Sequence, residues 1–260
     1  GEAAPRWVGE MYFEKHRGTY STQLGTKQGN RSSERLLHEL ELWSTIAEVR
    51  PSNIDELWRR VLTQQFHHII PGSSIAWVHD DAEAEHAAVA DEIESLLVRI
   101  IPVVSSDTHV LNPAPVAISA VVDIDSVPMW TSVEAFSSAH PVADLPEHVL
   151  AVTSSVANSS ITLDNGIVSI AINTDGTITH ISNGIRNLLP ADAGAQFVIR
   201  KDTPAEYDAW DIDMADANAI ASPLVATDAP VIVEASPLRI TVECGFATEL
   251  SRFTVRYSLR

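Results

Sequence analysis

The sequence predicts an α+β protein, a three-helix bundle followed by a partial antiparallel β-sandwich. Two patterns that meet near residue 102 support this prediction. Apolar residues recur at helical spacing in residues 30–101, whereas Val, Ile and Thr then alternate with small and polar residues between Pro, Gly, Asn and Asp. With 260 residues, of which 45% are apolar and 20% charged, the chain is long enough for one large or two ordinary folded domains.

Three helices with short connections are expected in the first part. The first is expected to begin at the cap candidates of residues 30–33 and to stop before Pro51. The second starts at the capping-box-like residues 52–55 and is ended by Pro71 and Gly72. The third begins after Ser73 and Ser74 and continues to Ile100 through an alanine-rich stretch. Helices of this kind favour an antiparallel bundle.

The second part predicts short strands. Asn165-Gly166 and Asp175-Gly176 are Asx-Gly turn signals and are the clearest hairpin evidence in the chain. Residues 103–150 are rich in Pro, Ser and Ala, and we expect a loosely structured connection that pairs at the edge of the sheet. The candidate strands are 110–113, 116–124, 148–152, 160–163, 167–172, 177–181, 197–200, 231–234, 238–244 and 253–259.

The charge balance excludes some partners. Lys and Arg number 17 against 35 Asp and Glu, so the formal net charge is −18, and we expect neither nucleic acid nor an anionic membrane as a partner. Cys244 is the single cysteine, which excludes an intrachain disulfide. The most apolar run, residues 96–104, is interrupted by Arg99 and Pro102 and is shorter than a membrane span of about 18–20 residues. Because the chain also opens without a basic and then apolar leader, we expect a cytoplasmic protein.

Adjacent histidines close the second predicted helix. Neighbouring helical residues point about 100° apart, so His67 and His68 are not expected to share one metal ion, although either could supply one ligand. The partial negative charge of a helix C-terminus would favour a cation there. Judged alone, the pair more simply places one ring in the bundle and the other in solvent.

Three further segments could carry chemistry. Residues 7–23 are dense in aromatic and charged groups that could bind sugars, although an ordinary polar loop explains them as well. Residues 207–216 hold four Asp, which favours a solvated acidic turn around Trp210 over a cation loop, because the calcium-loop spacing is absent. His79, Glu83 and His86 could form one facial metal site, but a solvated helix face is favoured.

Taken together and in this order, several motifs resemble glycoside hydrolase family 38, the α-mannosidases, and most closely its bacterial and cytosolic or vacuolar branch. The resemblance implies that residues 1–25 are the tail end of a catalytic domain. It makes residues 26–102 a three-helix middle domain and residues 103–260 the N-terminal, truncated part of a β-sandwich domain. The motifs lie at residues 7–20, 65–67, 70–74, 163–166, 174–176 and 208–213.

The resemblance implies a fragment of a retaining, metal-dependent enzyme that hydrolyses terminal α-mannosides of mannose-containing oligosaccharides. None of the family's catalytic carboxylates has a counterpart in the chain, so we expect it to be inactive alone. His67 matches the family's fourth ligand to a Zn2+ ion. His68 stands where the family usually has an Asp that contacts sugar hydroxyls. Arg17 and Tyr20 match a signature beside the cleft and are expected to bind substrate or shape the cleft.

Two other interpretations stay open from the sequence. A helical bundle and a sandwich with no complete site would also suit a non-catalytic carbohydrate-binding or assembly module. His68 in place of Asp would also suit a degenerate family member. A homo-oligomer is possible, since the long acidic third helix could face either solvent or a partner subunit.

Overall fold

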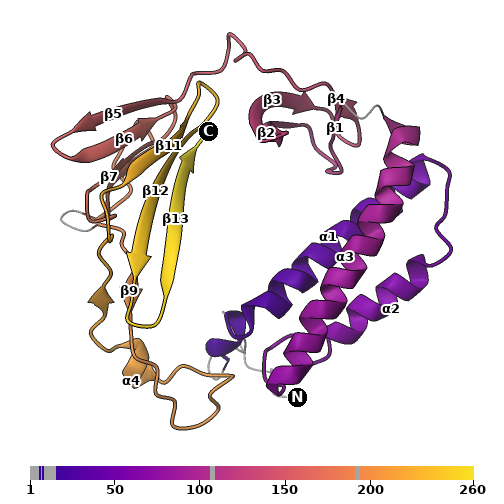
Figure 1. The fold of residues 1–260 in the computed structure, drawn as a ribbon, viewed down its shortest axis with the longest axis horizontal. Coiled ribbons are helices and arrows are strands. Elements are labelled where there is room, and N and C mark those ends of the chain that lie inside the picture. Colours follow the sequence, from indigo (N-terminus) through magenta and orange to yellow (C-terminus); the bar gives the residue numbers. More distant parts are fainter. Residues whose placement is uncertain (1–5, 7, 9–15, 106–108, 191–193) are drawn as a thin grey trace. The chain divides into compact units, whose positions relative to one another are not determined.

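The computed structural model describes residues 6, 8, 16–105, 109–190 and 194–260. The chain divides into two compact units, which are described separately (Figure 1). The helical unit comprises Gly1–Asp107 together with Lys201–Ala219, and the β unit comprises Thr108–Arg200 together with Ile220–Arg260. The chain thus returns to the helical unit for 19 residues in the middle of its β-rich part. No helix in the described ranges is both long enough and apolar enough to cross a bilayer.

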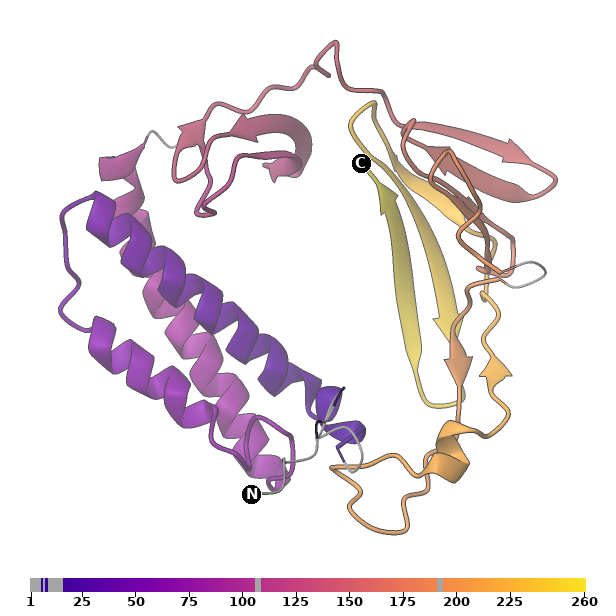
Figure 2. The ribbon, with the colours of Figure 1, turned by 180° about the vertical axis from the view of Figure 1, so that it is seen from behind.

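The helical unit contains the predicted bundle. Its main helices are α1 (Leu24–Ile46), α2 (Ile54–Gln64) and α3 (Ala76–Val104). The unit also contains a 3-10 turn, η1 (Gly18–Tyr20), which precedes α1, and a short helix, α4 (Met214–Ala217). Helices α1 and α3 lie side by side along their length in both views (Figures 1 and 2). Apolar side chains at helical spacing are buried between the helices and form this core. Its fully or nearly fully buried members include Leu37, Leu40, Leu57, Val61, Val89 and Ile93.

Helix α3 continues to Val104, past its predicted end at Ile100, and two other helix boundaries differ from the prediction. Helix α1 begins at Leu24 rather than at residues 30–33, because Gly25 and Gly29 let this end of α1 approach α3 closely. A Cβ atom on Gly29 would lie 2.8 Å from the Cβ atom of His86. Helix α2 ends at Gln64, so the placement of His67 in a last helical turn is wrong. The backbone there changes to tighter turns, in which the Phe66 amide donates to the carbonyl of residue 63 at 3.2 Å.

The β unit is antiparallel throughout its described pairings. Strands β5-β6-β7-β8 form a four-stranded sheet, β11-β12-β13 a three-stranded sheet, and β1-β4, β2-β3 and β10-β9 separate pairs. The bounds are β1 Val110–Leu111, β2 Ile118–Ile124, β3 Val127–Val133, β4 Ser138–Ala139, β5 Thr153–Ala157, β6 Ser160–Asp164, β7 Ser169–Ile172, β8 Ile178–Ser182, β9 Val198–Ile199, β10 Ser222–Pro223, β11 Val231–Ala235, β12 Ile240–Ala247 and β13 Arg252–Leu259.

The two larger sheets pack face to face, which confirms the partial antiparallel sandwich (Figure 2). Inward-facing side chains of the four-stranded sheet meet those of β12, and the single cysteine is buried among them. The predicted Asx-Gly turns are present, with Gly166 and Gly176 both at φ of 80°. The shared core consists of Val152, Ile161, Leu163, Ile172, Ile240, Val242, Cys244 and Phe246.

Part of the segment expected to be a loose connection instead forms a hairpin of two strands. Strands β2 and β3 pair in full register with each other and not with the edge of a larger sheet, so that expectation is wrong. Their turn residues, Asp125 and Ser126, have φ values of 50° and 66°. Arg239 ties the hairpin to the three-stranded sheet, since its guanidinium donates to both carboxylate oxygens of Asp123 at 2.7–2.8 Å and also pairs with Glu234 at 2.8 Å.

Candidate functional site

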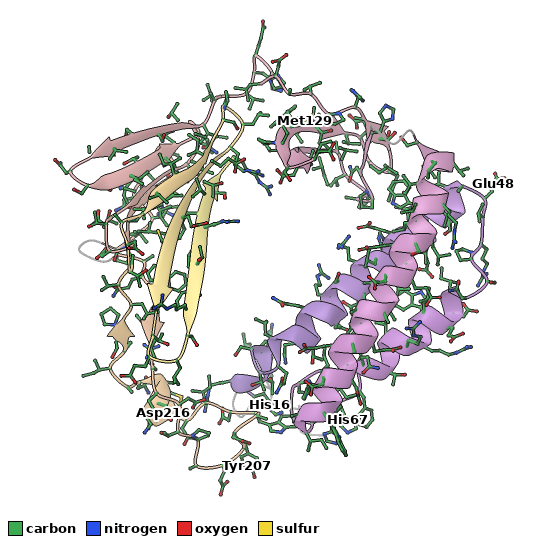
Figure 3. All side chains as sticks on the ribbon, viewed as in Figure 1. His16, Glu48, His67, Met129, Tyr207 and Asp216 are labelled. Atoms are coloured by element: carbon green, nitrogen blue, oxygen red, sulfur yellow. The ribbon has the colours of Figure 1, made fainter. Side chains whose placement is uncertain are left out.

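The two adjacent histidines lie on the loop that joins α2 to α3, residues 65–75, here called the His67 loop. The rings of Phe66, His67 and His68 form one cluster, with centroids of His67 4.2 Å from Phe66 and 4.1 Å from His68. Both imidazoles are exposed. Figure 3 shows His67 at the same end of the bundle as His16. The loop therefore presents aromatic and imidazole groups to the outside of the helical unit.

Hydrogen bonds hold both ends of the His67 loop. The Gln65 side-chain amide donates to the Asn30 side-chain oxygen at 3.0 Å and to a Glu34 carboxylate oxygen at 2.9 Å, both on α1. The carbonyl of His68 accepts a hydrogen bond of 2.7 Å from the Ser74 hydroxyl. Gly72 has a φ of 92°, a left-handed conformation that favours glycine. The loop is thus anchored although its histidine rings are exposed.

The donor chemistry of this loop suits one metal bond but not a complete metal site. The His67 imidazole makes ring contacts and no hydrogen bond within the described part of the chain, so a ring nitrogen can donate to a cation. No group of three or more His, Cys, Asp or Glu side chains that could hold a metal ion occurs among the described residues. A zinc ion with three or four protein ligands, one of them His67, would need further donors from outside the described residues.

Arg17 is committed to contacts inside the helical unit. Its Nε atom donates to the carbonyl of Ile212 at 2.9 Å, and Nη2 donates to Asp211 Oδ2 at 2.9 Å. The two charged side chains are only 20% and 14% exposed. His16 meets the Trp210 ring edge-on, with centroids 5.1 Å apart. Residues 207–213 therefore form a turn around a half-buried Trp210, in which one carboxylate pairs with Arg17.

The other predicted substrate-side residues have different environments. Tyr20 is 61% exposed at the end of η1, and its role at a sugar site stays a prediction, as do those of Arg17 and His68. Trp7, Glu10, Tyr12 and Glu14 of the same sugar-binding hypothesis lie outside the described residues.

The expectation of a solvated helix face at residues 79–86 is wrong for its two histidines. His79 and His86 are 2% and 3% exposed and face α1. Thr26 Oγ1 lies 3.1 Å from His79 Nδ1, and Ser33 Oγ lies 2.9 Å from His86 Nδ1. The Nε2 atoms of both rings are buried without a partner in the described part of the chain, and burial lowers the pKa of His86. The shared seven-residue spacing of the two hydroxyls and the two rings could have indicated this pairing.

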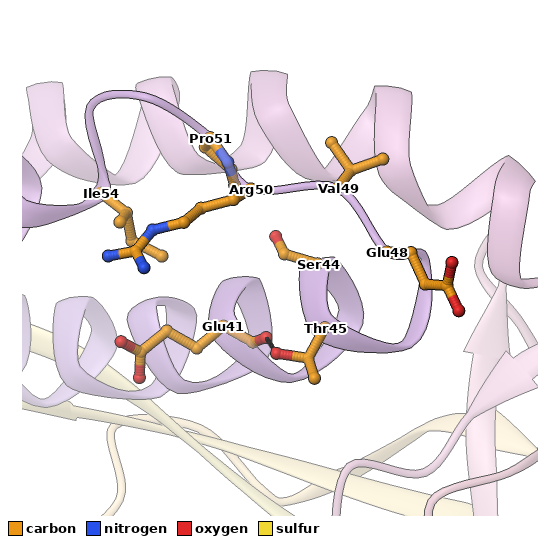
Figure 4. Close-up of a pocket in the computed structure, with 8 residues that line it drawn as sticks. All are labelled: Glu41, Ser44, Thr45, Glu48, Val49, Arg50, Pro51 and Ile54. Carbon is orange, nitrogen blue, oxygen red and sulfur yellow. Dashed lines mark hydrogen bonds between the residues drawn. The ribbon is translucent and has the colours of Figure 1, made fainter.

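Two hollows lie away from the predicted site residues. One, of about 450 Å³, lies at the α1–α2 connection beside Ser44 and Arg50, where Thr45 donates to the Glu41 carbonyl at 2.7 Å (Figure 4). The other, of about 620 Å³, lies in the β unit and is lined in part by Trp130. Neither hollow is lined by His67, His68, Arg17 or Tyr20.

Comparisons with known proteins agree with the two units. A model of the alpha mannosidase middle domain matches residues 14–102, and a model of the glycosyl hydrolases family 38 C-terminal domain matches residues 163–260. Alpha-mannosidase 2C1 of Homo sapiens is 29% identical over 274 residues, covering 92% of this chain and 25% of the relative. Alpha-mannosidase of Saccharomyces cerevisiae is 32% identical over 241 residues, covering 84% of this chain and 20% of the relative.

A solved structure is similar in fold. A glycosyl hydrolase family 38 protein from Enterococcus faecalis superimposes with a TM-score of 0.58 at 12% identity, covering 88% of this chain and 37% of that one. The chain spans about a quarter of the length of the human relative. The two domain models follow one another along the chain in the same order as its helical and β-rich parts. The chain therefore belongs to glycosyl hydrolase family 38, with residues that match the family's middle domain and C-terminal domain.

Proposed function

We propose that this chain forms part of a retaining, metal-dependent α-mannosidase that hydrolyses terminal α-mannosides, and that His67 is one ligand of its zinc ion. The observation that carries the proposal is the His67 imidazole, which is exposed and free of hydrogen bonds in the described residues on a loop anchored at both ends. The curated relatives named above are alpha-mannosidases, which supports glycoside hydrolysis as the reaction.

The reaction needs groups beyond those of the His67 loop. A retaining glycosidase uses two carboxylates about 5–5.5 Å apart, one as nucleophile and one as acid and base. We assign these carboxylates to a part of the enzyme other than the middle and C-terminal domains. Zinc, when bound, would hold the sugar hydroxyls and help the ring to distort towards the oxocarbenium-like transition state.

The residues of this chain then have positioning and binding roles. His67 offers a ring nitrogen, and the rings of Phe66 and His68 restrict its orientation. The exposed His68 could exchange hydrogen bonds with a sugar hydroxyl, which an imidazole does with one donor and one acceptor. Tyr20 offers an exposed aromatic face to the apolar side of a sugar ring.

The proposed substrate is a neutral, mannose-containing oligosaccharide. The formal charge of −18 supports this choice over nucleic acid or an anionic membrane, because like charges repel. A cytoplasmic location and a homo-oligomeric state stay predictions.

Replacing His67 by Ala in the complete enzyme tests the proposal. We expect the enzyme to lose its zinc and its kcat/KM for an aryl α-mannoside to fall by about 100-fold or more. Removing only a hydrogen-bond partner of a metal ligand already lowers metal affinity or activity by about 10–100-fold. The matched control is His38→Ala, which removes an exposed imidazole from α1 and should change neither quantity. Metal elemental analysis and steady-state kinetics measure both. Zinc content and turnover unchanged in His67→Ala, or turnover by the 260-residue chain alone, would contradict the proposal.

A further inference from the structure

Residues 207–213 form a tight strap on the helical unit. The carbonyl of Tyr207 accepts hydrogen bonds from the amides of Trp210 at 2.8 Å and Asp211 at 2.9 Å. Tyr207 itself has a φ of 57°, which closes the turn. The Asp211 carboxylate also accepts from the Ile212 amide at 2.9 Å. The turn thereby fixes the Trp210 carbonyl and the Asp211 carboxylate. Both groups contact residues that lie more than 180 positions earlier in the sequence.

Both of these groups hold the turn that precedes α1. The Asp211 carboxylate binds the Arg17 guanidinium, and the Trp210 carbonyl accepts the Gly18 amide at 2.9 Å. A Cβ atom on Gly18 would lie 3.2 Å from the Trp210 carbonyl carbon, so the two backbones are in close contact. Charge-assisted hydrogen bonds between half-buried groups are among the stronger polar contacts in proteins. Removing the Asp211 charge should therefore loosen residues 16–22.

The same turn contacts the His67 loop. The carbonyl of Gly18 accepts the Thr22 amide at 3.0 Å and the Thr22 hydroxyl at 2.8 Å. Thr22 in turn packs on Gly72, where a Cβ atom would lie 2.8 Å from Thr22 Cγ2. Within the loop, the Gly72 amide donates to the Ile69 carbonyl at 3.0 Å, and the Ile69 amide donates to the Phe66 carbonyl at 2.8 Å. Contacts thus run without a gap from the strap to the residue beside His67.

We infer that Asp211 is a positioning residue for the His67 loop. Its carboxylate fixes Arg17, and through Gly18 and Thr22 it fixes the side of the loop that carries Gly72. The consequence for catalysis rests on the proposed function, because it requires His67 to be a zinc ligand. A ligand side chain must be held within about 0.5 Å of its productive position, so a loosened loop would weaken the metal site.

The experiment follows amide hydrogen exchange in the 260-residue chain. In Asp211→Asn, we expect the amides of Ile69, Ile70 and Gly72 to exchange about tenfold faster or more, since a hydrogen bond to a charged group is lost. The His67 ring signal in the NMR spectrum should also shift, because its resonance depends on the neighbouring Phe66 and His68 rings. Amides at the centre of α3 are expected to keep their wild-type rates.

Asp208→Asn is the matched control. It removes the same charge from the same strap, but the Asp208 carboxylate is exposed and, among the residues that the structure describes, accepts only from the Ala209 amide at 3.0 Å. Wild-type exchange in this control together with fast exchange in Asp211→Asn supports the inference. If the Gly18 amide exchanges faster in Asp211→Asn while the amides of the His67 loop keep their wild-type rates, the inference is overturned. The contact between the strap and the turn before α1 would then be broken without any effect on the loop.

Arg17→Lys keeps the inference testable if Asp211→Asn does not fold. Lysine retains the charge but lacks the planar guanidinium whose Nε and Nη2 atoms donate separately to the Ile212 carbonyl and to Asp211. An intermediate increase in loop exchange supports the inference, and unchanged loop exchange overturns it. These measurements use no metal, so they are separate from the zinc and turnover tests. Zinc binding that survives His67→Ala would remove the proposed function and leave the exchange result as it is.

Discussion

Two buried histidines show what the sequence could and could not predict at single residues. His79 and His86 lie on a helix rich in Asp, Glu and Ala, so a solvated face was the natural prediction from composition. The structure buries both rings because each Nδ1 atom has a hydroxyl partner on α1, Thr26 or Ser33. The pattern along α3 alone does not contain this pairing, which becomes visible only when the seven-residue spacing of Thr26 and Ser33 is compared with that of His79 and His86.

The burial of His86 makes the stability of the bundle depend on pH. Desolvation lowers its pKa below the ordinary value of 6.5, although Glu85 and Glu34 lie near enough to oppose this shift. Well above pH 6.5 the ring is neutral in both the folded and the unfolded chain. As the pH falls below 6.5, the unfolded chain binds the proton first, so the free energy of unfolding decreases.

Denaturant unfolding measured from pH 7.5 to pH 5 tests this dependence. His86→Gln, which retains a hydrogen-bonding side chain opposite Ser33, should flatten the decrease in unfolding free energy. His38→Gln, on the exposed face of α1, should leave the slope as in the wild type. If the free energy of unfolding of His86→Gln decreases with falling pH as steeply as that of the wild type, another group causes the loss of stability below pH 6.5.

At the scale of elements, the helices were predicted in number and order but not in their ends. The start of α1 was missed because Gly25 and Gly29 weaken helix propensity, whereas in the structure the absence of their side chains permits contact with α3. The hairpin of β2 and β3 was missed because Asp125-Ser126 lacks the glycine that usually marks such a turn. In both cases packing overrides the local signal.

The two helical glycines give opposite predictions for the same substitution. Gly29→Ala should destabilise the bundle by about 1–3 kcal/mol, because the new methyl group meets the Cβ atom of the buried His86 and cannot be avoided without moving α3. Gly25→Ala places its methyl group against the exposed, flexible Glu83 carboxylate, which can turn away. It should therefore gain up to about 1 kcal/mol from helix propensity.

Thermal or denaturant unfolding of the two variants, measured in parallel with the wild type, checks this difference. If both substitutions change the free energy of unfolding by the same amount and in the same direction, the close approach of α1 and α3 at Gly29 does not determine the effect of an added methyl group.

For the whole molecule, the order of residues along the chain is a poor guide to which parts belong together. Residues 201–219 lie within the segment predicted as β-sandwich, yet they join the helical unit through Trp210 and Asp211. The sequence could single out this acidic stretch and expect a turn around Trp210. It could not identify Arg17 as the partner, because the charge pair spans 194 residues and no local pattern connects them.

The same distinction applies to the proposed site. The family resemblance pointed to His67, and the structure places this residue on an exposed, anchored loop with one available ring. The remaining donors of a zinc site do not occur together among the described residues. We therefore propose that His67 completes a zinc site whose other ligands come from another part of the enzyme.

Anomalous diffraction at the zinc edge from crystals of the complete enzyme tests this claim most directly. We expect a zinc ion with a ring nitrogen of His67 at about 2.0–2.1 Å, the usual bond length to imidazole. A bound catalytic zinc whose ligands are all supplied elsewhere, with the His67 ring outside its coordination sphere, would show that His67 is not a ligand.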